Sequence, residues 1–343
     1  MKMFVNHNNQ AHAELIFIVL FTSVVLSAIS CNRGRYGEIV DYRKGMSMPS
    51  WQSYEYLDSR VIESMLVLTE TGADHIAVVP TWYQESAESH SIYPTVNTPV
   101  DSAVIHVIME AKALGYEVML KPHVDVEDGT FRGDISPGDI NAWFNSYEEF
   151  VLHYANIAQL TGVEIFCVGT ELKNLSSRSE WIEIITSIKS IYYGMIVYAA
   201  NWDEYPSVGF WEYLDLIGID AYFPLAQDRE ATIEEYLQNL ELWLYQIDNF
   251  QRSIGKDILI TEVGFRSVRG CAVTPYEWQQ DGIMDEESQA DAYRTILVTL
   301  QRKSWLTGIF FWQWDPILRE DSIGYTPYNK QAEDVLREFW VEQ

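Results

Sequence analysis

The stretch VEIFCVGTE, Val163–Glu171, is a mostly apolar run that ends on a carboxylate. A second run, DILITEVGF at Asp257–Phe265, carries Glu262 directly after its apolar part. Short apolar runs rich in β-branched residues predict buried strands, of the kind found in parallel sheets that are covered on both faces. Both runs therefore predict core strands, and each places an acidic side chain at the strand's carboxyl end.

Six further runs of this kind follow Asp41, and helical patterns separate them. The eight predicted strands are Lys44–Pro49, His75–Trp82, Glu117–His123, Val163–Glu171, Met195–Trp202, Leu214–Tyr222, Asp257–Phe265 and Thr307–Trp314. The predicted helices are Ser59–Thr71, Pro99–Leu114, Asp139–Leu160, Ser179–Tyr193, Ile233–Ile254, Glu286–Ser304 and Asp334–Trp340. The connection Glu204–Tyr213 contains Pro206 and Gly209 and predicts only a short helix.

Alternating strands and helices indicate βαβ units on a parallel sheet, and eight of them in about 300 residues fit a (β/α)₈ barrel. The fold class that we predict is α/β, with residues 41–343 forming a single TIM barrel. An open doubly wound sheet is the alternative, but no glycine-rich phosphate turn follows the first strand. The 343 residues therefore hold one catalytic domain rather than two.

The amino-acid composition limits the classes of molecule that this protein is expected to bind. Fifty acidic residues against 23 basic ones give a net charge of −27, which disfavours nucleic acid and anionic membrane surfaces. Hydrophobic residues make up 48% of the chain, enough for a large core. Aromatic residues reach 14%, which points to a neutral ligand with flat faces.

The N-terminus predicts export. An apolar run at Leu15–Ile29 suits a secretory signal, and Ala28–Cys31 resembles the end of a bacterial lipoprotein signal, in which the cysteine is lipidated. We expect residues 1–30 to be the signal peptide, Cys31 to carry lipid and residues 31–40 to be a linker. The protein would then be anchored at the cell surface or in the periplasm. A plain signal peptide or an uncleaved anchor is the alternative.

The remaining cysteines and the histidines do not suggest a metal site. Cys167 lies in an apolar run and is expected to be a buried small hydrophobe, with a bridge to Cys271 as an alternative. No cluster has metal-ligand spacing, so we predict no metal and no cofactor.

The carboxyl ends of the predicted strands are rich in polar and aromatic residues. They read Ser50-Trp51, Thr81-Trp82-Tyr83, Lys121-Pro122-His123, Thr170-Glu171, Asn201-Trp202, Asp220-Ala221-Tyr222, Thr261-Glu262 and Trp312-Gln313-Trp314. Active sites of such barrels gather at this end. Two glutamates meeting there could have divergent pKa values, one serving as acid and one as nucleophile, as retaining cleavage of a glycosidic bond requires. The alternative is that each glutamate pairs with Lys121, Arg266 or another neighbour.

Several motifs together resemble glycoside hydrolase family 113, whose characterised members are β-mannanases. The matching stretches are Lys44–Ser47, Pro80–Tyr83, Lys121–Val124, Val168–Leu172, Gly218–Leu225, Ile260–Gly264, Phe311-Trp312 and Ile323–Pro327. The similarity covers about residues 41–340. Family 113 belongs to a wider clan of retaining (β/α)₈ glycosidases with glutamates at the ends of strands four and seven.

The resemblance implies a catalytic mechanism. Glu171 would be the general acid/base and Glu262 the nucleophile of a double displacement. The wider clan usually has Asn, which binds the 2-hydroxyl, before the acid/base; here that residue is Thr170, and Asn201 is the candidate replacement.

Other strand-end residues are candidates for substrate binding, each with a structural alternative. Tyr222 could hydrogen-bond the nucleophile or be rim packing. His123 could bind a sugar hydroxyl or tune Glu171, or be a satisfied structural histidine. Asp220 could join the hydroxyl network or pair with Lys121.

Four tryptophans complete the predicted site. Trp82 and Trp202 are expected to be platforms at neighbouring subsites. Trp312 and Trp314 have period-two spacing. We expect one of them to form the surface under the sugar at the cleavage point and the other to belong to the core. The sequence does not say which is which.

These observations predict an exported endo-acting glycoside hydrolase that cleaves β-1,4-mannosidic bonds in mannan or glucomannan. The predicted partner is a neutral β-linked polysaccharide or oligosaccharide. The alternatives are the same chemistry on another neutral β-glycan, transglycosylation, a non-catalytic glycan-binding lipoprotein, or an interaction scaffold.

Overall fold

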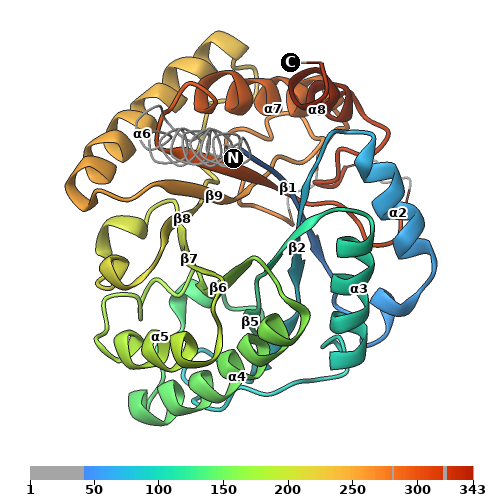
Figure 1. The fold of residues 1–343 in the computed structure, drawn as a ribbon. Helices are drawn as coiled ribbons and strands as arrows, with labels where there is room; N and C mark the ends of the chain where they lie inside the picture. The colour runs from blue at the N-terminus through green and yellow to red at the C-terminus, as the bar shows by residue number, and fades with distance from the viewer. Residues whose placement is uncertain (1–41, 280–281, 320–322, 343) are drawn as a thin grey trace, which may run out of the picture. The chain divides into compact units, whose positions relative to one another are not determined.

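The computed structural model describes residues 42–279, 282–319 and 323–342. Eight parallel strands of this part of the chain close into a barrel in the order β1-β10-β9-β8-β7-β6-β4-β2, with helices around it (Figure 1). The described residues from Arg43 onward form one compact unit. The predicted single (β/α)₈ barrel is confirmed.

The barrel strands are β1 (Arg43–Pro49), β2 (His75–Val79), β4 (Glu117–Leu120), β6 (Ile165–Thr170), β7 (Met195–Asn201), β8 (Leu216–Asp220), β9 (Ile258–Val263) and β10 (Leu306–Trp312). The helices are α2 (Arg60–Thr69), α3 (Asp101–Ala113), α4 (Ile140–Thr161), α5 (Glu180–Ile191), α6 (Ile233–Ile254), α7 (Glu286–Leu300) and α8 (Gln331–Trp340). Short 3₁₀ turns lie at Glu55–Leu57, Arg132–Asp134, Tyr205–Ser207 and Trp211–Tyr213. The last two form the short connection predicted after β7.

Two predicted strands run on past the barrel strand into a second strand. The runs His75–Trp82 and Glu117–His123 each divide at a proline, Pro80 or Pro122. Beyond the prolines the chain continues as β3 (Thr81–Gln84) and β5 (His123–Val126), which pair with each other in a separate two-stranded parallel sheet. Because proline has no N–H to donate, it interrupts the barrel's ladder at these points.

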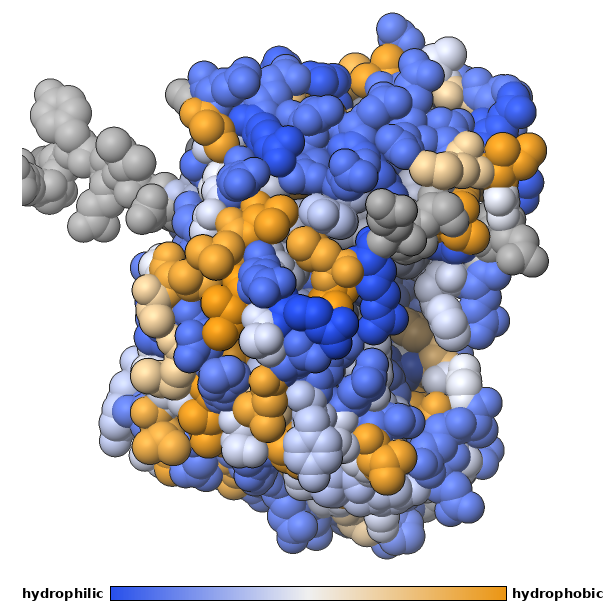
Figure 2. Space-filling model, turned by 90° about the vertical axis from the view of Figure 1, so that its right-hand side faces the viewer, coloured by the Kyte–Doolittle hydropathy of each residue, from blue (hydrophilic) through white to orange (hydrophobic). Residues whose placement is uncertain are grey.

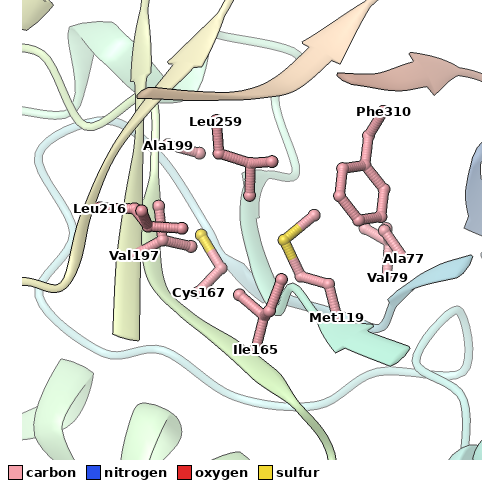
Figure 3. Packing of buried hydrophobic residues seen from close by; sticks show 10 residues of the cluster. All are labelled: Ala77, Val79, Met119, Ile165, Cys167, Val197, Ala199, Leu216, Leu259 and Phe310. Carbon is pink, nitrogen blue, oxygen red and sulfur yellow. The ribbon is translucent and has the colours of Figure 1, made fainter. Parts of the chain in front are cut away.

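Apolar side chains from seven of the barrel strands fill the interior (Figure 3). Their packing also explains Gly45 of β1, where a Cβ atom would lie 2.3 Å from the ring of Phe310. Cys167 belongs to this cluster and is fully buried, as predicted, and both Cys167 and Cys271 are free thiols. The interior is therefore a packed core, and a site can form only at its rim.

Figure 2 shows one face of the molecule, on which hydrophilic residues predominate and hydrophobic ones lie in smaller groups. No helix in the described ranges is long and apolar enough to cross a membrane. The predicted signal peptide, Cys31 and the linker lie outside the described residues, so these assignments stay predictions.

Candidate active site

Charged side chains converge at the carboxyl ends of the barrel strands. Lys121 follows β4, Glu171 follows β6, Asp220 ends β8, and Glu262 lies near the end of β9; all four are buried. Strand register brings them together, because Asp220 is paired with both Asn201 of β7 and Glu262 of β9. Buried charges are costly unless they are paired, so this concentration at one end of the barrel marks the candidate site.

Glu262 is surrounded by hydrogen-bond donors. Tyr222 donates its hydroxyl proton to Oε2 of Glu262 at 2.7 Å, and the Lys121 ammonium contacts Oε1. Burial, reinforced by the charge of Glu262, raises the pKa of Tyr222 well above its usual value, so the phenol keeps its proton. The hydrogen bond predicted between Tyr222 and Glu262 is confirmed, and the alternative pairing of Glu262 with Lys121 is present as well.

Asp220 forms the second half of the Lys121 site. Lys121 Nζ lies 3.1 and 3.2 Å from the two oxygens of Asp220, and Thr261 donates its hydroxyl to Oδ1 at 2.7 Å. Burial and the charge of Glu262 raise the pKa of Asp220, although Lys121 opposes the shift. Burial alone would lower the pKa of Lys121, but the two carboxylates raise it. The alternative expected from sequence, pairing of Asp220 with Lys121, is therefore present.

His123 lies beside Glu262 and not, as one interpretation held, beside Glu171. Its Nε2 is 3.6 Å from Oε1 of Glu262, and its ring is stacked on Trp312 with centroids 6.1 Å apart. Nε2 is buried without a hydrogen-bond partner within the described residues. Burial lowers the pKa of His123 well below its usual value, and the charges of Arg132 and Lys121 add to this effect. A neutral imidazole with a free nitrogen can bind a hydroxyl group.

Glu171 has a different environment from Glu262. Arg132 donates to its Oε2 at 3.2 Å, and within the described ranges Glu171 forms no hydrogen bond or ion pair with Lys121. Burial raises the pKa of Glu171 well above its usual value, and the negative charge of Asp220 adds to this, while Arg132 opposes it. A carboxyl group of this kind can remain protonated and act as a general acid.

The backbone at Glu171 is unusual. Its φ of 53° lies in the left-handed region, which non-glycine residues seldom adopt. Gly133, next to Arg132, packs so closely that a Cβ there would lie 3.1 Å from the Glu171 carbonyl oxygen. The loop that carries Arg132 therefore rests directly on the turn that presents Glu171.

Sequence reasoning missed Arg132 and Asp125. Arg132 NH2 donates to Oδ1 of Asp125 at 2.5 Å, and this aspartate fixes the guanidinium beside Glu171. Asp125 lies in β5, beyond the proline that ends the barrel strand, and Arg132 lies in a 3₁₀ turn. An arginine in a loop carries no periodic signal; the sequence RGD at 132–134 gives no reason to place it at the rim.

The structure distinguishes the two tryptophans of the last strand. Trp312 is half-buried, stacked on His123 and in edge contact with Trp51 at 6.4 Å. Trp314 is fully buried, and its Nε1 donates to Oγ of Ser64 at 2.9 Å. Of the two, Trp314 is therefore the core residue, and it drops out of the candidates for substrate binding. Strand β10 ends at Trp312, so the period-two rule no longer applies two residues later.

The other two tryptophans contact aromatic side chains outside the charged cluster. Trp82 packs against α4, with ring centroids 5.4 Å from Phe150 and 5.5 Å from His153. It lines a hollow of about 510 Å³ whose lining residues include none of the buried charged groups. Trp202 is stacked on Tyr276 of the loop after β9 at 6.1 Å. Substrate binding by Trp82 and Trp202 stays a prediction.

Asn201 has an unused acceptor. Its side chain is 8% exposed, and its Oδ1 is buried without a hydrogen-bond partner in the described ranges. Such a group needs an explanation in a well-packed protein, and a ligand hydroxyl would supply it. The predicted contact with the 2-hydroxyl stays a prediction. Among residues 42–279, 282–319 and 323–342, no group of three or more His, Cys, Asp or Glu residues has the arrangement of a metal site.

Comparison with known proteins decides the family. The model of glycoside hydrolase family 113 matches residues 49–330. The chain belongs to this family. It is therefore a glycoside hydrolase, as predicted, and the resemblance proposed from the strand-end motifs is confirmed.

Solved structures agree with this assignment. A GH113 β-1,4-mannanase complex is 26% identical, with a TM-score of 0.82 over 88% of this chain and 100% of that one. The GH113 β-mannanase AaManA from Alicyclobacillus acidocaldarius, in complex with ManMIm, is 26% identical with a TM-score of 0.80, over 89% and 99% of the two chains. A Faecalibacterium prausnitzii β-glucuronidase, 12% identical with a TM-score of 0.58, covers 88% of this chain and 49% of that one and shares only the fold. No curated protein matches significantly.

Proposed function

We propose that this glycoside hydrolase cleaves β-1,4-mannosidic bonds inside mannan or glucomannan chains with retention of configuration. Glu262 acts as the nucleophile and Glu171 as the acid/base. The observation that carries the proposal is the contrast between the two glutamates. Glu262 accepts hydrogen bonds from Lys121 and Tyr222. Glu171 is buried, and burial together with the charge of Asp220 raises its pKa.

The proposed reaction uses these environments in turn. A protonated Glu171 donates its proton to the leaving glycosidic oxygen while Glu262 attacks the anomeric carbon. Glu171, now ionised, deprotonates a water molecule that releases the glycosyl-enzyme, and it thereby regains its proton. The donors on Glu262 hold its carboxylate in place for attack and for departure in the second step.

Lys121 and Asp220 support the nucleophile as a pair. A lysine between two buried carboxylates balances one negative charge and leaves the cluster with a net charge of −1, which matches a cationic, oxocarbenium-like transition state. His123 and Asn201, whose buried atoms lack partners in the described ranges, provide hydroxyl-binding groups. Trp312 provides an aromatic face beside them.

Mannan is the proposed substrate because three similar solved structures, each matched over 99–100% of its own chain, are β-mannanases. Another neutral β-glycan, or transfer to a sugar acceptor, would use the same residues. Reducing-end release from mannan, glucomannan, xylan and β-glucan tests the choice. We expect release from the first two only, and faster release from xylan would contradict it.

Catalytic roles are tested by Glu171→Gln and Glu262→Gln, with the exposed Glu212→Gln as a matched control. We expect each of the first two to lower turnover at least ~10³-fold and the control to leave it unchanged. Wild-type turnover in Glu262→Gln would contradict the mechanism.

We also propose that the chain is exported and lipid-anchored through Cys31. Membrane fractions of cells expressing the full chain and Cys31→Ala test this. The lipidated chain should sediment with membranes, and the variant should be released from them. Equal partition of both would contradict lipidation.

A further inference from the structure

Glu204 is a fully buried carboxyl group that lies just beyond the rim of the site. It follows β7 and precedes the 3₁₀ turn at Tyr205–Ser207. Its Oε1 accepts a hydrogen bond from the Tyr198 hydroxyl at 2.6 Å, and its Oε2 accepts one from the Asn201 backbone N–H at 2.8 Å. Burial raises the pKa of Glu204 to about 7, against these hydrogen bonds. A buried site disfavours the charge of a carboxyl group, so the presence of Glu204 at this position indicates a specific role.

Tyr198 extends the contact of Glu204 to the neighbouring strand end. Its hydroxyl, while donating to Glu204, accepts the backbone N–H of Leu172 at 2.9 Å. Leu172 directly follows Glu171. The N–H of Glu171 itself is donated to the Ala199 carbonyl oxygen of β7 at 2.8 Å. Thus β7 holds the peptide groups on both sides of Glu171.

This support acts on a strained turn. A left-handed φ of 53° is unfavourable for glutamate, and such a conformation persists only where the surrounding structure holds it. The Leu172 N–H is buried with Tyr198 as its partner, so the phenol fixes the direction in which the chain leaves Glu171. The direction of the carboxyl group follows from that of the backbone.

The same acid also holds the other side of the site. Its second oxygen fixes the backbone N–H of Asn201, whose unpartnered side-chain oxygen lies at the end of β7 opposite Asp220. One buried carboxylate therefore connects the turn that carries Glu171 with the strand end that carries Asn201. Both oxygens accept hydrogen bonds, an arrangement that a carboxylate satisfies fully.

We propose that Glu204 is a positioning residue, which acts through Tyr198 to hold Glu171 in its proton-donating orientation and acts directly to place Asn201. The proposal rests on the acid/base role proposed for Glu171. It adds two residues, one in β7 and one in the loop after it, that do not touch the substrate. Loss of the Tyr198 hydroxyl should impair protonation of the leaving group more than attack by Glu262.

The test compares Tyr198→Phe with Tyr147→Phe on two substrates. Tyr147 is a matched control, because it is another buried tyrosine whose hydroxyl bonds the same chain segment, donating to the Val168 carbonyl oxygen at 2.8 Å. One substrate is β-1,4-mannan, whose sugar leaving group needs a proton. The other is 2,4-dinitrophenyl β-mannobioside, whose leaving group departs as a stable anion.

We expect Tyr198→Phe to lower kcat on mannan by ~10-fold or more relative to its effect on the dinitrophenyl glycoside, which corresponds to the loss of one or two buried hydrogen bonds. Tyr147→Phe should change both substrates by the same factor. Glu204→Gln should keep its amide oxygen on the Asn201 N–H, which can only donate, and turn its NH2 toward the Tyr198 hydroxyl, which thereby loses its acceptor. It should therefore show the same selectivity as Tyr198→Phe. It also provides the comparison if Tyr198→Phe does not fold.

The positioning role would be overturned if folded Tyr198→Phe and Glu204→Gln lowered kcat equally on both substrates. The factor would then be the one seen in Tyr147→Phe. The acid/base assignment is tested separately. If Glu171→Gln retains wild-type activity on mannan, the proposed function fails. If Glu171→Gln is inactive on mannan while Tyr198→Phe shows no selectivity, only the positioning role fails.

Discussion

Replacement of Lys121 by methionine tests the charge balance at the centre of the site. Lys121 Nζ lies 3.1 Å from Asp220 and also contacts Glu262, and all three side chains are buried. At an effective dielectric constant of 20, a charge pair at this distance is worth about 5 kcal/mol, or about 4 pKa units. In Lys121→Met the two carboxylates should therefore share a proton at neutral pH.

The variant should lose activity and become more sensitive to alkali. We expect turnover to fall at least ~10³-fold, because a protonated Glu262 is a poor nucleophile. A carboxyl group whose folded-state pKa is raised contributes stability below its unfolded pKa and loses it as the pH rises through the folded pKa. In the wild type the pKa of Asp220 is already raised to about 7, so the proton that the variant keeps at higher pH should lower its free energy of unfolding, relative to the wild type, by about 3 kcal/mol between pH 7 and pH 9.

Urea unfolding of both proteins at pH 7, 8 and 9 measures the difference. The double variant Lys121→Met/Asp220→Asn is the control, because it removes one cation and one anion together. It should recover most of the stability lost at pH 9. Parallel stability curves for the wild type and Lys121→Met, with turnover within threefold, would show that Lys121 does not keep Glu262 ionised.

Three other substitutions test the remaining contacts. Tyr222→Phe removes a charge-assisted hydrogen bond from the nucleophile at 2.7 Å, and kcat/KM should fall ~10–150-fold with little change in melting temperature; an unchanged kcat/KM would show the bond to be incidental. Arg132→Met removes the cation that opposes the raised pKa of Glu171, so the alkaline limb of the kcat profile should move up by roughly 1–3 pH units, whereas a downward shift would contradict the acid role. Trp312→Ala should lower kcat/KM ~10-fold in a folded enzyme, while Trp314→Ala should lower the free energy of unfolding by about 3–5 kcal/mol. The reverse pattern would show that Trp314 contacts the substrate and Trp312 belongs to the core.

The strands and most helices follow from the sequence because the barrel repeats a strong local pattern. The predicted helix Ile233–Ile254 matches α6 at both ends, where Thr232 caps the first turn and Gly255 ends the helix in the left-handed region. The predicted strand ends also bring Glu171, Asp220 and Glu262 to the same rim, because parallel strands share their carboxyl edge.

What the sequence does not reveal depends on side-chain direction and on loops. Trp312 and Trp314 differ in role because β10 stops between them, and alternation holds only within a strand. Arg132 reaches Glu171 from a 3₁₀ turn that no periodic pattern marks. From the sequence, Glu204 is expected to be an exposed acidic loop residue, but in the structure it is fully buried.

The role of Glu262 as nucleophile is measured most directly by the mass of the enzyme after reaction with a 2-deoxy-2-fluoro-β-mannobiosyl fluoride. This reagent slows release of a glycosyl-enzyme, so a retaining enzyme accumulates it. We predict one added glycosyl group, located by peptide mapping on Glu262. Stoichiometric labelling of a different carboxylate, or full turnover of mannan to products of inverted configuration, would contradict the assignment.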